Sequence, residues 1–306
     1  MHFFALLLDI YHITQTIIEA KQILAMSSLV GFAIMRDNIN MIKVINWNVS
    51  YANNKENKFS SIYNSADKYT IIILEEVTPK HYEELKEVFY DCNIEYSLNY
   101  RKPGKFDTKQ RQLGIAIITT EDLPILSAKC LDRCLLPERT LLVEVKYGHK
   151  PLKVLGLHSI TGCDHKKAKS MQFYSFAEAI DEYKPDIVGM DANEPEVDHY
   201  DVSKMKFFDN KDKGKGAQTF FNTLVENALY DTYAPHYRKY EYRSTKPLTV
   251  SHKVSGKIDK RYDFIFTNRG LDSCKYSYAE GILFGSDHAI IECNIKPHIK
   301  THSREQ

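Results

Sequence analysis

One stretch of the chain reads Lys184-Pro185-Asp186-Ile187-Val188-Gly189-Met190-Asp191-Ala192-Asn193-Glu194-Pro195. An apolar run closed by a carboxylate and an amide, then broken by a proline, is typical of a buried strand that ends in a loop. Alternate residues of a strand share a face, so Asp191 and Asn193 are expected to reach one small ligand. A carboxylate that takes a proton, beside an amide that donates to oxygen, suits a phosphoryl group. The local alternative is that the pair caps the next turn.

Length and composition favour one large domain. The chain has 306 residues with 43% hydrophobic content, and no linker, repeat or low-complexity tract divides it. The formal net charge is +1, so any contact with nucleic acid must come from local basic loops. The six cysteines are scattered and form neither a disulfide framework nor a zinc ribbon, which favours a reducing, cytoplasmic compartment. We expect a monomer without a protein partner.

Residues 1–40 differ from the rest of the chain. Their apolar runs, 3–8 and 23–35, lack the basic start of a signal peptide and the length of a membrane span. We expect an N-terminal extension that is helical or an artefact of the start site, with membrane association as the alternative. The domain is expected to cover 41–298, followed by a polar tail at 299–306.

Hydrophobic patterning predicts an α/β (α+β) protein with strands early and late and helices between them. Predicted helices cover 59–68, 78–89, 164–183 and 218–229, and 204–216 is expected to be a mobile loop. Predicted strands, besides 187–191, cover 42–50, 71–74, 95–101, 114–119, 125–131, 140–146, 152–158, 261–267, 275–280 and 289–295. This alternation predicts a four-layer α/β/β/α sandwich, in which two packed mixed β-sheets lie under outer helices.

Polar residues recur where the predicted strands end. They are Asn48, Glu75 or Glu76, His158, Asp191, Asn193, Asp263, Asp287 and His288. So many acids at the ends of apolar strands would be costly unless a cation gathers them. An all-oxygen set such as Glu76, Asp287 and Asn48 favours Mg²⁺ or Mn²⁺ over zinc. His158 and His288 are the natural groups for proton transfer and phosphate contact.

Six motifs follow one another along residues 42–296. They are Asn46-Trp47-Asn48, Leu74-Glu75-Glu76-Val77, Gly156-Leu157-His158, Gly189-Met190-Asp191-Ala192-Asn193, Arg261-Tyr262-Asp263-Phe264-Ile265-Phe266 and Gly285-Ser286-Asp287-His288. The series resembles the endonuclease/exonuclease/phosphatase superfamily, whose fold is that of deoxyribonuclease I. The resemblance implies a deoxyribonuclease-I-like sandwich and a Mg²⁺-dependent hydrolase acting on phosphoester bonds.

The resemblance also implies a metal and substrate site. Glu76 would be the principal metal ligand, and Asp287 would complete the metal site. Asn48 would bind substrate or orient groups near the metal. Glu75 stands where the family usually has Gln, and because neighbours on a strand face opposite ways, only one of the two acids should reach the site. Arg139 matches a position where the family often carries an arginine near the substrate phosphate, with a surface ion pair as the alternative.

The remaining roles implied by the resemblance are catalytic. His158 would contact the scissile phosphate or protonate the leaving oxygen. Asp191 would position or deprotonate the attacking water, and Asn193 would hold a phosphate oxygen in the transition state. Asp263 would hydrogen-bond His288, which faces the phosphate.

Substrates of this family range from DNA and RNA to inositol phosphates and sphingomyelin, so the motifs do not choose the substrate. Three basic segments favour nucleic acid: 101–111, 165–169 and 236–243, the last with aromatic and cationic side chains interleaved. The leading hypothesis is a nuclease-like phosphodiesterase. The alternatives are a phosphatase or lipid phosphodiesterase, acting on an inositol phosphate or sphingomyelin, and a non-catalytic binding module.

Overall fold

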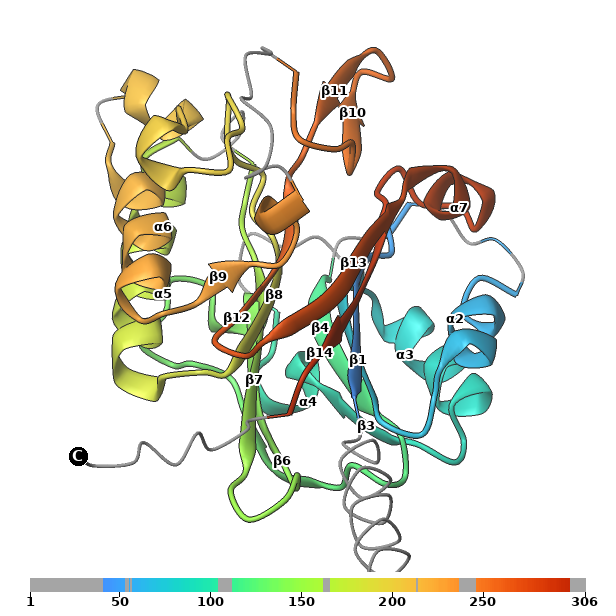
Figure 1. Cartoon of the computed structure of the whole chain (residues 1–306). Coiled ribbons are helices and arrows are strands. Elements are labelled where there is room, and N and C mark those ends of the chain that lie inside the picture. Colours follow the sequence, from blue (N-terminus) through green and yellow to red (C-terminus); the bar gives the residue numbers. More distant parts are fainter. Residues whose placement is uncertain are drawn as a thin grey trace, which may run out of the picture. The chain divides into compact units, whose positions relative to one another are not determined.

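Two mixed six-stranded sheets pack face to face between helices in this computed structural model (Figure 1). It describes residues 41–52, 55, 57–103, 112–161, 166–212, 214–236 and 246–297, all within the unit Met41–Gln306. The predicted four-layer α/β/β/α sandwich is confirmed. Residues 1–40, whose extension was predicted from sequence, lie outside the described residues, as does the tail 299–306. Within the described chain, no helix is both long and apolar enough to span a bilayer.

The first sheet contains one parallel pair, β1 with β2, and its other neighbours are antiparallel. In spatial order its strands are β13 (Leu271–Ser277), β14 (Ile290–Ile295), β1 (Ile42–Asn48), β2 (Thr70–Val77), β4 (Gly114–Thr119) and β3 (Asn93–Tyr96). The carboxyl ends of β1 and β2 therefore lie side by side, next to the start of β14.

The second sheet repeats this plan with β7 and β8 as its parallel pair. Its strands, in spatial order, are β5 (Ile125–Lys129), β6 (Thr140–Val145), β7 (Leu152–His158), β8 (Ile187–Asp191), β12 (Asp263–Thr267) and β9 (Tyr230–Asp231). The register pairs His158 with Asp191 and Asp191 with Asp263. Three polar side chains thus start from adjacent positions at one edge of the sheet.

The outer layers are helices that cover separate faces of the two sheets. Their bounds, with those of the short elements, are α2 (Ser60–Ser65), α3 (Pro79–Val88), α4 (Ser97–Tyr100), η1 (Pro137–Arg139), α5 (Lys166–Tyr183), η2 (Val202–Lys204), η3 (Phe208–Asp212), α6 (Gly216–Glu226), η4 (Ala234–His236) and α7 (Tyr278–Leu283). A separate hairpin joins β10 (His252–Val254) to β11 (Ile258–Lys260). Thr78 caps α3, because its hydroxyl oxygen accepts a hydrogen bond from His81 N.

Three apolar clusters hold these layers together. The central cluster lies between the sheets and includes Val44, Ile73 and Val154. A second cluster, rich in phenylalanine, packs α5 and α6 against the second sheet, and a third packs α2 and α3 against the first. Each sheet is buried on both faces, which explains why its central strands are apolar runs rather than alternating ones.

The second strand is interrupted where its polar residues begin. The pairing of β2 with β4 shifts register between Leu74 and Val77, and Glu76 has φ 57°, in the left-handed region. A bulge of this kind re-aims a side chain at the end of a strand. It therefore sets the direction of the Glu76 carboxylate at the edge where β1 and β2 end.

The structure departs from the sequence prediction in four places. The predicted strand 95–101 is the end of β3 followed by α4, and 275–280 is the end of β13 followed by α7. The β10–β11 hairpin was not predicted. Residues 204–216 are not simply a mobile loop, because they contain η3, in which the Asp209 carboxylate accepts from Ala217 N at 2.9 Å. In each case tertiary contacts decide a short element whose own pattern is weak.

We expect Gly189→Ala to destabilise the protein by about 1–3 kcal/mol, since a β-carbon there would overpack the space between the sheets. It would collide with the Asn46 side-chain oxygen and lie 2.6 Å from Ile73 Cδ1. Urea unfolding measures the change. The control is Gly270→Ala, whose β-carbon would meet no atom closer than 3.5 Å. Equal effects of the two substitutions would contradict this account of the packing.

Candidate active site

Asp191 lies at the centre of the polar side chains that the two sheets bring together. Its Oδ2 accepts from Asn48 Nδ2 at 2.9 Å and from Asn193 Nδ2 at 3.2 Å, and its Oδ1 accepts from Asn193 N at 2.9 Å. Asn48 belongs to the first sheet and Asp191 to the second, so one hydrogen bond joins their strand ends. Burial and the charge of Asp263 raise the pKa of Asp191 to about 7 despite these donors.

His158 lies beside Asp191 in a defined tautomer. Arg139 Nη1 is 2.7 Å from His158 Nδ1, and because a guanidinium only donates, Nδ1 must be the acceptor. The ring proton of neutral His158 is therefore on Nε2, which lies 3.7 Å from Glu76 Oε1 and 3.8 Å from Asp191 Oδ2. Arg139 is buried beside this ring and does not lie on the surface.

His288 and Asp263 form a second imidazole–carboxylate pair. His288 Nδ1 lies 3.0 and 2.9 Å from the two carboxylate oxygens of Asp263. Burial alone would lower the pKa of His288, but the charges of Asp263 and Asp191 raise it well above its usual value. This pairing favours a charged imidazole whose Nε2 is left for another group.

The predicted metal ligands lie around the same edge. Glu76 is 19% exposed and Asp287 is 56% exposed, so both carboxylates are open to solvent on part of their surface. Both carboxylates act on Lys58, whose pKa is lowered to about 8 by burial against the opposing effects of Glu84, Glu76 and Asp287. Asn48 is buried, and its Oδ1 accepts from Ser50 N. Ser286 Oγ donates to Asn48 O at 2.6 Å, which ties the loop carrying Asp287 to the end of β1.

Glu75 forms the buried floor of the site. The alternation of a strand would direct one of two adjacent acids away, yet Glu75 and Glu76 both interact with site residues because the strand is bulged. Among the described residues, neither oxygen of Glu75 has a partner in hydrogen-bonding geometry. Burial, followed by the charges of Asp263 and Asp191, raises the pKa of Glu75 well above its usual value. The raised pKa favours the protonated, uncharged form of Glu75, which would resemble the uncharged Gln usual at this position in the family that the motifs resemble.

A buried ion pair supports the loop after β8. Lys169 Nζ, on α5, lies 2.9 Å from Glu194 Oε1 and donates to Asn193 O at 2.6 Å. Asn193 itself has φ 48°, in the left-handed region, and Glu194 also accepts from Phe208 N. Lys169 therefore holds the loop that carries Asn193. The prediction that it belongs to a basic surface for nucleic acid is wrong, because its side chain is buried.

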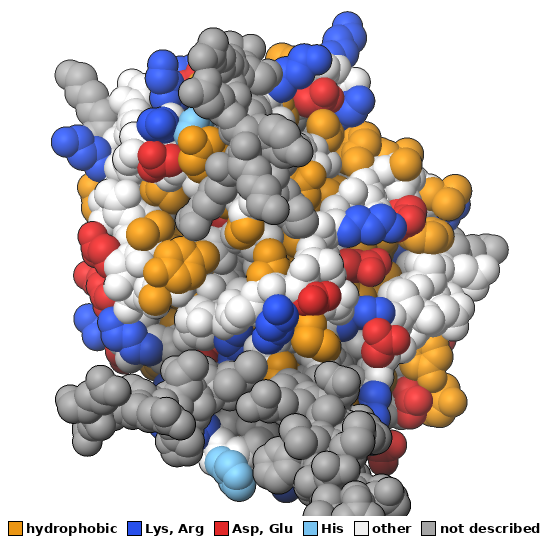
Figure 2. Space-filling view, viewed as in Figure 1, with side chains coloured by type: hydrophobic (Ala, Val, Ile, Leu, Met, Phe, Trp, Pro, Cys, Tyr) orange, Lys and Arg blue, Asp and Glu red, His pale blue; other side chains and the backbone are white. Residues whose placement is uncertain are grey.

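The structure describes only a small part of the other basic segments, so it tests their predicted role in nucleic-acid binding very little. Residues 104–111, 162–165 and 237–245 lie outside them, and Arg101 pairs with Asp132 at 3.4 Å. On the face shown in Figure 2, blue and red side chains are interspersed rather than gathered by sign. The basic surface proposed from sequence stays a prediction.

Sequence reasoning missed two residues that the structure places at or behind the site. Lys169 was read as a surface cation, and its burial was hidden because a lysine on a helix is usually solvated. His252 was not singled out, although it starts β10 and its ring lies 4.5 Å from that of His288. The isolated bridge between these two histidines joins segments far apart in the chain, and no local pattern signals it.

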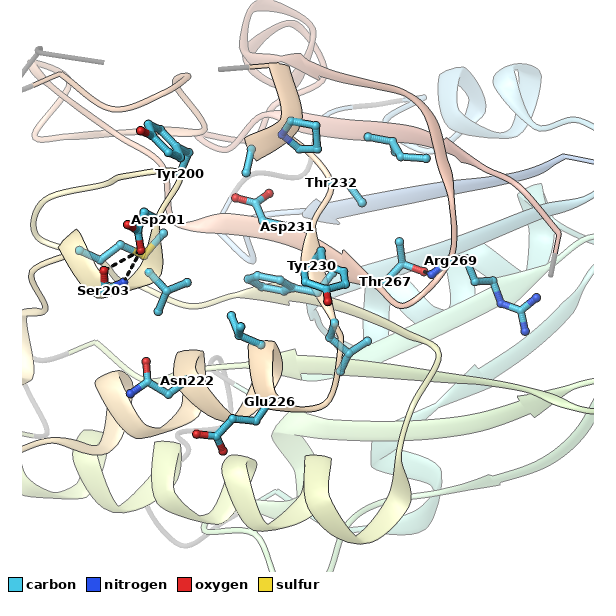
Figure 3. Close-up of a pocket in the computed structure, with 18 residues that line it drawn as sticks. Tyr200, Asp201, Ser203, Asn222, Glu226, Tyr230, Asp231, Thr232, Thr267 and Arg269 are labelled. Carbon is cyan, nitrogen blue, oxygen red and sulfur yellow. Dashed lines mark hydrogen bonds between the residues drawn. The ribbon is translucent and has the colours of Figure 1, made fainter. Parts of the chain in front are cut away.

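A separate pocket of about 660 Å³ lies at the edge of the second sheet (Figure 3). Val225 and Tyr230 contribute to its largely apolar wall, with Asp231 and Arg269 among its polar residues. None of the residues predicted to form the site lines it. Residue chemistry therefore favours the strand ends, where titratable groups converge, over this pocket as the active site.

We expect Glu75→Gln to stabilise the protein increasingly as pH rises above about 4.5. A buried acid with a raised pKa keeps a proton that the unfolded chain releases, so the wild type loses stability between its unfolded and folded pKa values. The gain should grow by up to about 1.4 kcal/mol per pH unit. Urea unfolding in EDTA from pH 5 to 8 measures it. Glu83→Gln on the exposed face of α3 is the control, and a pH-independent difference for Glu75→Gln would refute the account.

We expect Lys169→Met to cost about 3–5 kcal/mol of stability, because it leaves the Glu194 carboxylate buried without its cation. Lys169→Met combined with Glu194→Gln should recover most of the loss, since Gln can still accept from Phe208 N. Lys167→Met, exposed on the same helix, should be nearly neutral. Denaturant unfolding compares the four proteins. A single Lys169→Met variant as stable as Lys167→Met would show that the pair does not support the loop.

Comparisons with known proteins identify the fold through structure alone. No family model and no curated protein sequence matches the chain. D. rerio TDP2 complexed with a single-strand DNA product is similar with a TM-score of 0.55 and 13% identity, over 84% of this chain and 100% of that one. The Neisseria 3′ phosphatase NExo, bound to a product DNA hairpin, gives a TM-score of 0.57 and 14% identity over 84% and 100%.

A third solved structure carries the family name itself. The endonuclease/exonuclease/phosphatase family protein from Bacteroides thetaiotaomicron is similar with a TM-score of 0.53 and 15% identity, over 85% of this chain and 99% of that one. At this level of identity the likeness shows the fold. The chain has the deoxyribonuclease-I-like fold of the endonuclease/exonuclease/phosphatase superfamily, as the order of its motifs predicted.

Proposed function

We propose that this protein is a divalent-metal-dependent phosphodiesterase that hydrolyses phosphoester bonds in DNA or RNA. The observation that supports the proposal is that two histidines, each held by a hydrogen-bonding partner, lie close to Asp191. His158 with Arg139 approaches Asp191 on one side, and one ligand atom each of Asp263 and His288 lies within 4.8 Å of an Asp191 oxygen on the other. The fold hosts several chemistries, so the site rather than the fold supports this reaction.

The structural neighbours support nucleic acid as the substrate class. D. rerio TDP2 and the Neisseria 3′ phosphatase NExo were both solved with DNA products. Each likeness covers 84% of this chain. This favours a nucleic-acid substrate over the lipid and inositol-phosphate alternatives.

The residues present fit a hard divalent cation. Burial and, after it, the neighbouring negative charges raise the pKa values of Asp191 and Glu75, and a cation would offset those charges. We assign Glu76, Asp287 and Asn48 to Mg²⁺ or Mn²⁺, since all three offer oxygen. When bound, the ion supplies Lewis-acid neutralisation of the phosphate and of the departing oxygen.

Asp191 is the best-placed group to take a proton from the attacking water. Its pKa of about 7 lies near neutral pH, where a general base combines availability with proton affinity. Asn48 and Asn193 hold both of its oxygens, so the direction of the carboxylate is set before substrate arrives. The Asn193 amide can donate to a phosphate oxygen when it exchanges its contact with Asp191.

The two histidines act as donors to the phosphate. His288, charged and oriented by Asp263, presents Nε2 to the negative charge that develops there. His158 presents an Nε2 proton because Arg139 occupies its Nδ1. Arg139 is therefore a positioning residue for His158, and its direct contact with the substrate phosphate remains a prediction.

We expect the purified full chain to cut fluorescent DNA or RNA oligonucleotides with Mg²⁺ and to spare them in EDTA. Asp191→Asn and His288→Ala should each lower kcat/KM by roughly 10²-fold or more, because they remove the proposed base and a charged phosphate contact. A panel of single- and double-stranded DNA and RNA, with electrophoretic readout, measures the rates. Substrates with a 3′-terminal phosphate distinguish phosphatase from diesterase cleavage.

The control variant is His149→Ala, which removes an exposed histidine from the turn before β7 and should leave the rates unchanged. Cleavage that persists in EDTA would reject the metal mechanism. Intact nucleic acids together with hydrolysis of an inositol phosphate or sphingomyelin would replace the nuclease proposal by its enzymatic alternative. Tight DNA binding without turnover of any substrate would identify a non-catalytic binding module.

A further inference from the structure

A second cluster of possible metal ligands lies at the mouth of the site, beside the acids already assigned. His252 at the start of β10, with Asp287 and His288 before β14, each offer one ligand atom, and these atoms lie within 4.8 Å of one another. A bridge between the backbones of His252 and His288 brings the two segments together. This set differs from the all-oxygen set because two of its three members are imidazoles.

Both histidines have one ring nitrogen beside an oxygen acceptor. His288 Nδ1 is held by Asp263, and His252 Nδ1 lies 3.2 Å from Asp287 O. Histidines that bind metals usually donate their second ring nitrogen to a carboxylate or carbonyl, which fixes the ring and raises the basicity of the other nitrogen. His288 therefore offers Nε2 to a cation, whereas His252 approaches the Asp287 carboxylate with Nδ1, which lies 3.7 Å from Asp287 Oδ2.

The position of the His252 ring is further restrained by stacking. Its neighbours are the His288 ring at 4.5 Å and the Tyr262 ring at 5.7 Å, with interplanar angles of 32° and 24°. Asp287, in contrast, is 56% exposed and can turn its carboxylate with little resistance. Ligand atoms around tetrahedral zinc lie about 3.3 Å apart, given bonds of about 2.0–2.1 Å. The three ligand atoms lie within 4.8 Å of one another, so binding requires them to draw closer, and the exposed Asp287 carboxylate is the member that can move most easily.

We propose that His252, Asp287 and His288 form a second cation site that takes a transition-metal ion of the Zn²⁺ class. Two imidazoles and one carboxylate match the ligand preference of Zn²⁺, whereas Mg²⁺ prefers oxygen donors. Three protein ligands leave a fourth position for water or a phosphate oxygen.

Occupation of this site inhibits hydrolysis, a consequence that rests on the function proposed above. Zn²⁺ would take Asp287 from the oxygen-ligand set and His288 Nε2 from the phosphate. His252 belongs only to the zinc cluster. The chain therefore offers one residue through which zinc binding can be removed while the proposed catalytic groups stay intact.

The first test is direct binding of Zn²⁺ to the full-length protein, measured by calorimetry and by competition with a chromogenic zinc chelator. We expect one Zn²⁺ site in the parent that is weakened at least about tenfold in His252→Ala and unchanged in His149→Ala. His252→Asn, which keeps a polar side chain next to Asp287 O, should lose the site equally. Absence of Zn²⁺ binding by the parent, or equal binding by His252→Ala, overturns the proposal. These readouts do not depend on any enzymatic activity.

The second test uses inhibition at a fixed Mg²⁺ concentration. His252→Ala should keep the parent's rate in Mg²⁺ within about threefold and should require at least tenfold more Zn²⁺ for half-inhibition. Co²⁺ substituted for Zn²⁺ should give visible absorption bands that His252→Ala lacks. If zinc inhibits the parent and His252→Ala alike, the inhibitory site lies elsewhere. If no substrate is cut, the binding experiment still decides whether the cluster holds metal.

Discussion

The rest of this site depends on one constraint: several acidic side chains are buried close together, away from water. Asp191, Asp263 and Glu75 are fully buried, and the mutual effect of their charges, together with burial, raises the pKa of two of them. Such a cluster is stable only if protons, imidazolium or a metal ion offset the charge. His288 supplies one positive charge from within the chain, and the proposed divalent cation supplies the rest.

Both sheets position these side chains. Each sheet contributes one parallel pair of strands, so four carboxyl ends face the same edge and the antiparallel strands β12 and β14 begin there. The hydrogen bond from Asn48 to Asp191 crosses between the sheets. Groups outside the reacting set then fix directions: Arg139 fixes the tautomer of His158, and Lys169 holds the backbone of Asn193. The geometry of the candidate site therefore depends on both sheets together.

Asp287 belongs to both of the proposed sets of metal donors. With Glu76 and Asn48, Asp287 completes an oxygen set suited to a hard cation, while with His252 it joins a nitrogen-rich set suited to a softer one. The two sets share the Asp287 carboxylate, so an ion in the proposed nitrogen-rich site competes for a ligand of the proposed oxygen set. Under the two proposals, the choice of metal at this edge depends on which ion is present as well as on affinity, and a substitution of His252 separates the two outcomes.

The sequence by itself determined the sandwich fold, and it identified most of the polar residues that lie together at the strand ends. Apolar runs ended by Asn48, His158 and Asp191 mark buried strands, and strands of two parallel pairs must place such ends together. Local pattern was insufficient for residues whose environment is made by distant segments. From local pattern alone, Lys169 was predicted to be a surface cation, His252 was not predicted to be a site residue, and a strand was predicted where α4 forms. Glu75 and Glu76 were also treated as alternating neighbours, although a bulge re-aims them. Only the tertiary structure decided these points, because burial, tautomer and charge coupling arise from contacts between residues that sequence spacing does not relate.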